Sequence, residues 1–169
     1  TTSKRKGHFN VKPNGRMLYA LAPLPYATGL VPTLLGHEIT FRFLPSVREA
    51  KGLSLSQQNE LGFRMSMKSG MNLFFGMSSI LYGASRNFQS LGGKAGSSGL
   101  SLRKLAGFSP VMLYRMLTAR YRAKRDGTQV LPRDLYKLDG FVCISTDSAR
   151  YKDELEAMWG CRPLEVCGG

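Results

Sequence analysis

Short apolar runs recur along this chain and alternate with longer segments that have the period of an α-helix. The predicted strands cover residues 16–22, 39–43, 73–75, 141–145 and 163–166. The run 141–145 is apolar without a break, which is typical of a parallel strand that is buried on both faces. The hydrophobic pattern therefore predicts a sheet built from several short strands.

Capping residues and glycines bound four predicted helices. Ser54 and Gln57 have the spacing of a capping box, which predicts a helix that ends near Gly70. The other three helices begin at Ser78 or Ser79, at Ser109 with Pro110 in the first turn, and at Thr146 or Ser148. In the first helix the apolar positions also alternate with period two, as in a strand, but the cap and the glycine favour a helix.

Strand, helix and strand follow one another within residues 141–166, which is a βαβ unit. We therefore expect an α/β fold, with a mainly parallel sheet, helices on its faces and ligands beyond the carboxyl ends of the strands. Residues 90–101 are rich in glycine and serine and are expected to form a flexible surface loop.

Composition and charge limit the classes of function. The chain has 169 residues, of which 43% are apolar, and it has no apolar run of about 20 residues that could span a membrane. The net charge is +13, and residues 1–125 hold 19 basic and only three acidic side chains. This imbalance favours an anionic partner, which could be a nucleic acid, a phospholipid headgroup or a nucleotide phosphate.

The cysteines and histidines indicate no metal site. The three cysteines are an odd number without metal-ligand spacing, and His8 and His37 are the only histidines. We expect the cysteines to be reduced and buried. The polar start of the chain has no signal peptide, which predicts a cytoplasmic location.

Four segments carry candidate chemistry, and each also has a simpler interpretation. Residues 1–6 combine hydroxyls with three cations and could bind phosphate, or could be a solvated basic terminus. Residues 115–125 form a basic helical segment that could lie on nucleic-acid phosphates or in water. Asp147 could be functional or could cap a helix. The methionines that could line an acyl pocket or fill the core are Met65, Met67, Met71 and Met77.

The two ends of the chain resemble motifs of the adenylate-forming enzymes. Thr1-Thr2-Ser3-Lys4-Arg5-Lys6 is similar to the second half of their phosphate-binding signature, Ser-Gly-Thr-Thr-Gly-x-Pro-Lys. Glu165-Val166-Cys167-Gly168-Gly169 is similar to their Tyr-Gly-x-Thr-Glu motif, cut before Thr-Glu. Residues 19–29, 70–75 and 131–160 resemble the branch of the plant auxin-responsive acyl-amido synthetases and their bacterial relatives.

The resemblance implies a fragment, residues 1–169, of the adenylation domain of a two-step ligase. A carboxylic acid and ATP would form an acyl-adenylate, which a thiol such as CoA or an amine such as an amino acid then captures. The cofactors implied are ATP and Mg²⁺, with no metal ligand in this part of the chain. The phosphate- and nucleotide-binding residues implied are Thr1, Thr2, Ser3, Lys4, Lys6, Cys167, Gly168 and Gly169, with Lys6 also catalytic. The implied substrate pocket is bordered by Tyr26, Thr146 and Asp147.

Two alternatives to the ligase remain. The basic residues 1–125 could belong to a nucleic-acid-binding module, although no zinc finger, aromatic RNA-binding signature or DNA-reading helical pair accompanies them. A degenerate relative without catalysis is the other alternative. The chain lacks an initiator Met and stops at Cys-Gly-Gly, which suggests a piece of a longer protein. The resemblance implies that the missing Thr-Glu includes the Mg²⁺-binding carboxylate, so we expect the 169 residues alone to be inactive.

Overall fold

The computed structural model describes residues 12–21, 27–30, 41–94, 107–144 and 148–166, and the structural statements below concern those residues. The strands are β1 (Arg16–Ala20), β2 (Arg42–Leu44), β3 (Leu73–Gly76), β4 (Gly140–Cys143) and β5 (Leu164–Glu165). The helices are η1 (Ala27–Leu30), α2 (Val47–Ala50), α3 (Leu55–Ser69), α4 (Ser78–Lys94), α6 (Pro110–Asp126), α7 (Pro132–Leu135) and α8 (Ser148–Trp159).

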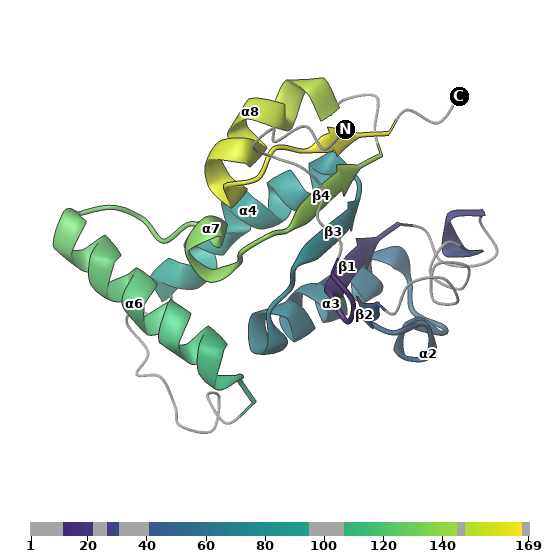
Figure 1. Ribbon diagram of the computed structural model, residues 1–169, viewed down its shortest axis with the longest axis horizontal. Helices are drawn as coiled ribbons and strands as arrows, with labels where there is room; N and C mark the ends of the chain where they lie inside the picture. Colours follow the sequence, from purple (N-terminus) through teal and green to yellow (C-terminus); the bar gives the residue numbers. More distant parts are fainter. Residues whose placement is uncertain (1–11, 22–26, 31–40, 95–106, 145–147, 167–169) are drawn as a thin grey trace.

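The five strands form one parallel sheet in the order β2-β1-β3-β4-β5 (Figure 1). The predicted α/β fold with a parallel sheet is therefore confirmed. The predicted βαβ unit is β4-α8-β5, in which Val142 pairs with Leu164. Gly160, the residue that follows α8, has a φ of 69°, a left-handed conformation that glycine adopts without strain.

The starts of α3 and α6 follow the predicted caps. The Ser54 side chain accepts a hydrogen bond from the backbone of Gln57, and the Gln57 side chain accepts one from the backbone of Ser54. Ser109 caps α6 in the same way, by accepting from Met112 N. Each side chain satisfies a backbone N–H that has no partner within the helix.

The period-two pattern in α3 has a packing explanation. The buried face of α3 consists of the small or polar residues Gln58, Gly62 and Ser66. A Cβ on Gly62 would lie 2.5 Å from Leu18 Cδ1 and 2.8 Å from the Leu44 carbonyl oxygen, so the helix backbone lies very close to the sheet. The alternating residues Leu61, Phe63, Met65 and Met67 flank this narrow face and are half-buried. Apolar residues therefore lie on both sides of the buried face of α3. Along the sequence they fall at every second position, which imitates the period of a strand.

Two predictions about α4 are wrong. The helix includes Ser78 as its first residue, so neither Ser78 nor Ser79 precedes it as a cap. It continues to Lys94, so the predicted loop 90–101 does not begin at Ser90. The glycines near its end lower helix propensity by only about 1 kcal/mol each, which a helix already formed can tolerate. The part of the predicted loop beyond Lys94 lies outside the described residues.

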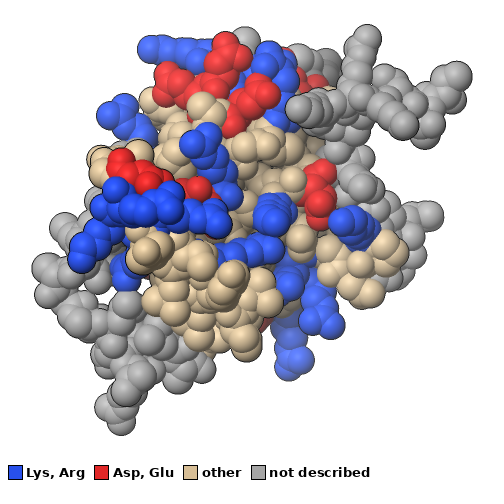
Figure 2. All heavy atoms as spheres, turned by 60° about the vertical axis from the view of Figure 1, so that its left-hand side comes forward, with Lys and Arg blue, Asp and Glu red and all other residues tan. Residues whose placement is uncertain are grey.

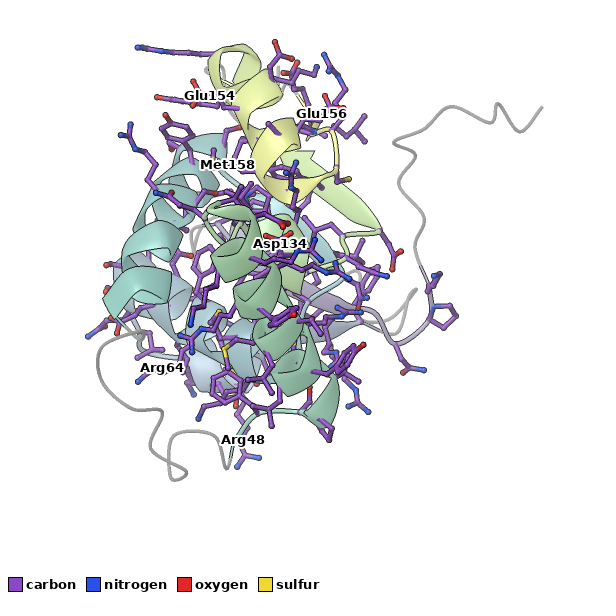
Figure 3. The ribbon with its side chains drawn as sticks, turned by 90° about the vertical axis from the view of Figure 1, so that its left-hand side faces the viewer. Arg48, Arg64, Asp134, Glu154, Glu156 and Met158 are labelled. Carbon is purple, nitrogen blue, oxygen red and sulfur yellow. The ribbon has the colours of Figure 1, made fainter. Side chains whose placement is uncertain are left out.

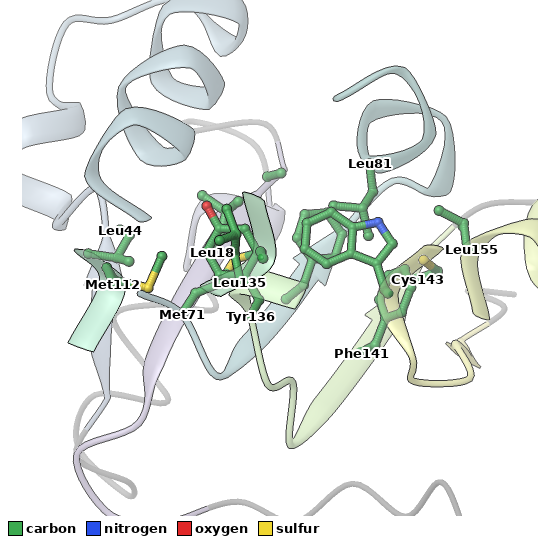
Figure 4. Packing of buried hydrophobic residues seen from close by; sticks show 14 residues of the cluster. Leu18, Leu44, Met71, Leu81, Met112, Leu135, Tyr136, Phe141, Cys143 and Leu155 are labelled. Atoms are coloured by element: carbon green, nitrogen blue, oxygen red, sulfur yellow. The ribbon is translucent and has the colours of Figure 1, made fainter. Parts of the chain in front are cut away.

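The core has two clusters, one on each face of the sheet. The larger one combines Leu18 and Phe74 of the sheet with side chains from α4, α6, α7 and α8 (Figure 4). The smaller one contains Met17, Tyr19, Leu21 and Leu73. Among the described helices, α3, α4, α6, α7 and α8 contribute side chains to the larger cluster and none to the smaller one, so these helices pack on the first face.

A buried hydrogen bond joins α4 to α8. Trp159 Nε1 donates to Ser85 Oγ at 2.7 Å, and Ser85 Oγ donates to the Leu81 carbonyl oxygen at 2.6 Å. The Trp159 ring also stacks on Tyr136, with ring centroids 5.6 Å apart. None of the described helices is both long enough and apolar enough to cross a membrane.

Candidate functional site

The strand order singles out one place where a ligand would bind. The chain continues from β1 to β2 on one side and from β3 to β4 on the other, so the direction of the connections changes between β1 and β3. In open α/β sheets, ligands bind beyond the carboxyl ends of the strands at this kind of switch point. We call this edge, where β1, β3, β4 and β5 end, the carboxyl edge.

The backbones of β1 and β3 approach closely at the carboxyl edge. A Cβ on Gly76 would lie 2.8 Å from both the Cβ and the carbonyl oxygen of Ala20, and 2.9 Å from Phe74 Cζ. The Gly76 carbonyl oxygen accepts a hydrogen bond from Ile144 N at 3.0 Å. Glycine thus leaves no side chain between the two strands where the switch point lies.

Tyr19 ties the segment after β1 to the sheet. Its hydroxyl donates to the carbonyl oxygen of Thr28 in η1, and its ring stacks on Phe75 with centroids 5.5 Å apart. Burial raises the pKa of the Tyr19 hydroxyl to about 12, so this group stays protonated and remains a donor at neutral pH. Tyr19 therefore positions the chain on the carboxyl side of β1.

The thiol of Cys143 lies at the end of β4. Burial raises its pKa to about 11, and the neighbouring Ser78 hydroxyl acts in the opposite direction. The Cys143 thiol is fully buried and is therefore protonated and unreactive at neutral pH. The Cys143 thiol therefore packs at this edge and supplies no nucleophile there.

The described residues contain no cluster of metal ligands, since no group of three or more of their His, Cys, Asp and Glu side chains could hold a metal ion. Glu165 is a carboxylate at the carboxyl edge, and its Oε1 lies 3.3 Å from Lys152 Nζ in an ion pair.

Every predicted site residue lies outside the described residues. These are Thr1, Thr2, Ser3, Lys4, Lys6, Tyr26, Thr146, Asp147, Cys167, Gly168 and Gly169. Three of the predicted segments nevertheless come after described strands in the sequence. Tyr26 follows β1, the pair Thr146 and Asp147 follows β4, and residues 167–169 follow β5.

The other candidates from the sequence separate in space. Met71 lies in the larger core cluster, with Met65 and Met67 packed against it, whereas Met77 packs against the smaller cluster on the opposite face. The four methionines are therefore core residues and line no common acyl pocket. Cys143 is buried as expected, Cys161 is half-buried, and both are free thiols. His8 and His37 lie outside the described residues.

Two hollows in the described part of the chain lie away from the carboxyl edge. One, of about 580 Å³, lies between the second half of α6 and α7 and is lined by Arg122, Asp126 and Asp134 among others. The other, of about 150 Å³, lies at the amino ends of the strands beside Asn14, Asn72 and Asp139. In the second hollow, Lys12 Nζ is 3.7 Å from Asp139 Oδ1, so its charges are already paired.

Sequence reasoning missed Tyr19 and Gly76, the two described residues that shape the switch point. Tyr19 looks like one more apolar position in a strand, and the only sign of its role is a hydroxyl in an otherwise apolar run. Gly76 follows a strand and precedes a helix, which is also the place of an ordinary turn glycine.

Comparison of the chain with models of protein families, with curated proteins and with solved structures finds no match.

Proposed function

We propose that this chain is part of an ATP-dependent ligase that activates a carboxylic acid as its acyl-adenylate. One observation carries the proposal. The segments that contain Tyr26, Thr146 with Asp147, and Cys167 with the final glycines each follow a strand that ends at the carboxyl edge. In a parallel sheet the carboxyl ends lie along the same edge, and ligands of α/β proteins bind there. The order of these motifs and strands along the chain supports a ligand site at this edge.

The reaction would need positioning and charge neutralisation more than covalent help from the protein. A carboxylate oxygen attacks the α-phosphorus of ATP, the bond to the β-phosphate oxygen breaks, and pyrophosphate leaves with the bonding electrons. Thr1, Thr2 and Ser3 would donate hydrogen bonds to phosphate oxygens, and Lys6 would neutralise the pyrophosphate as it leaves. A thiol or an amine would then attack the acyl carbon and release AMP. An enzyme of this kind works on soluble metabolites, and a cytoplasmic location fits it.

Equilibrium dialysis with labelled ATP tests the nucleotide site. We expect the chain to bind ATP and the Lys6→Ala variant to bind it about tenfold more weakly, because a charge-assisted contact to phosphate is lost. Lys51→Ala is the matched control, since Lys51 is an exposed cation after α2 and should not affect binding. No ATP binding by the unaltered chain, or an equal loss in both variants, would contradict the proposal.

A second assay separates ligation from the alternatives. We expect no pyrophosphate release above a protein-free control with any carboxylic acid, because the Mg²⁺-binding carboxylate that the resemblance implies is not among these 169 residues. A longer parent protein should release pyrophosphate. If the parent binds ATP but releases no pyrophosphate, the protein is a degenerate relative without catalysis. Binding of generic RNA or DNA that persists at physiological salt, without ATP binding, would favour the nucleic-acid-binding module.

A further inference from the structure

The outer face of α6 is an apolar stripe that no other described element covers. Val111, Tyr114, Leu117 and Tyr121 lie three, three and four residues apart, so they share one side of the helix over three turns. Each of these side chains is between 57% and 70% exposed. The opposite face is already packed, with Met112 and Ala119 buried in the larger core cluster. The helix is therefore apolar on two sides, and only one of them is covered by other described residues.

The inner contacts hold α6 firmly in place. Arg115 Nη1 donates to the Leu135 carbonyl oxygen at 3.1 Å, and Ser109 N donates to the Lys68 carbonyl oxygen at 2.8 Å. Gly127 ends the helix with a φ of 63°. The stripe thus lies on a rigid, preformed helix, which lowers the entropy that binding must overcome.

Two cations, Arg120 and Lys124, border the stripe, each three residues after one of its members. Neither forms an ion pair with any described residue, whereas Arg122 lines the hollow that also contains Asp126 and Asp134, and Arg125 is paired with Asp126 at 2.7 Å. Lys124 follows Tyr121 by three residues, so it lies at the end of the stripe itself. Figure 2 shows Lys and Arg side chains beside a broad uncharged surface on this side of the molecule. Of the carboxylates labelled in Figure 3, Glu154 and Glu156 lie on α8, and Asp134 lies on α7 beside the second half of α6.

We propose that this face of α6 binds an amphipathic helix of a partner protein, with an apolar ridge bordered by Asp and Glu. An apolar centre with a charged border is the arrangement of a protein interface. The residue spacing is that of ridges which pack against a second helix. Acidic residues on the partner would complement these cations and favour this occupant.

Other occupants fit this face less well. A second copy of the chain would bring like-charged α6 helices together, which costs free energy. Single-stranded nucleic acid would use the tyrosines for stacking, but Val111 and Leu117 offer no ring on which a base can stack. The proposal is independent of the ATP site, which lies at the carboxyl edge.

Synthetic helical peptides test the proposal directly. One peptide carries leucines on one face bordered by glutamates, and its counterpart has glutamine in place of each glutamate. We expect the unaltered chain to bind the glutamate peptide at least about tenfold more tightly than the glutamine peptide, with the difference reduced by salt. Leu117→Ser and Tyr121→Ser should each weaken binding by about tenfold, while their circular dichroism stays unchanged because both side chains are exposed.

Matched controls and a charge exchange complete the test. Val47→Ser removes an exposed apolar side chain from α2 and should leave binding unchanged. The double variant Arg120→Glu with Lys124→Glu should lose the glutamate peptide and gain one bordered by lysines. The proposal is overturned by an absence of binding, by equal effects of Val47→Ser and Leu117→Ser, or by failure of the charge exchange. Preference for an RNA oligonucleotide, for anionic vesicles or for self-association through the same residues would overturn it as well.

Discussion

Gly76 shows how a single hydrogen in place of a side chain fixes the distance between the two central strands. We predict that Gly76→Ala lowers the free energy of unfolding by about 1–3 kcal/mol, because the new methyl group would overlap the backbone and Cβ of Ala20. Denaturant unfolding measures the change. Gly83→Ala is the control, since Gly83 is exposed within α4 and its Cβ would meet nothing within 4 Å. The free energy of unfolding of Gly83→Ala should rise by about 1 kcal/mol. A similar decrease in both variants would contradict the close approach of β1 and β3 at Gly76.

Cys143 should make the protein sensitive to alkaline pH. Its pKa is about 11 in the folded protein and near 9.0 in the unfolded chain, so the folded state holds this proton more tightly. Its contribution to stability is full below pH 9 and is lost as the pH rises through 11. We predict that the denaturant midpoint falls over this range and that Cys143→Ala reduces the fall. An identical pH dependence in the variant would argue against the burial of this thiol.

At the scale of elements, local signals were enough for most boundaries. The capping box of Ser54 and Gln57 and the glycine after α8 act within one helical turn, so they are visible in the sequence. The inner face of α3 was not visible in this way, because small residues indicate a close contact only when the partner is known. The continuation of α4 past Ser90 was missed for a related reason. Glycine and serine disfavour a helix without forbidding it, so composition alone does not fix its end.

The contact between α4 and α8 should depend on one hydroxyl. We predict that Ser85→Ala lowers the free energy of unfolding by about 1–3 kcal/mol, since the buried Trp159 N–H loses its acceptor. Trp159 is the single tryptophan, so its fluorescence and near-ultraviolet circular dichroism report the change at this contact. Ser79→Ala is the control, because Ser79 is exposed on the same helix. Equal effects of the two substitutions would show that the hydrogen bond does not stabilise the protein.

At the scale of the whole molecule, the sequence predicted the class of fold but not the strand order. The βαβ unit at the end of the chain is local, whereas the place of β1 between β2 and β3 depends on contacts between distant residues. The exposure of the α6 stripe is also a tertiary property, because the same spacing would suit a buried face. For the candidate site, the sequence supplied the motifs, whose residues lie outside the described part of the chain, and the sheet supplies the carboxyl edge at which the preceding strands end.

Hydrogen exchange can locate the nucleotide on the molecule. We predict that ATP slows amide exchange at Leu21, Met77 and Ile144, which follow the carboxyl ends of three strands. Amides at Asn14 and Asn72, at the opposite edge, should be unaffected and serve as the internal control. Protection confined to that opposite edge would contradict the proposed site.

The central position of β1 also has a consequence for synthesis of the protein. Its pairing with β3 can form only after residues 21–76 have left the ribosome. At about 5–20 residues per second this takes several seconds, during which one side of an apolar strand has no neighbour. The nascent segment 16–21 is therefore the natural target for a chaperone that holds extended apolar chains.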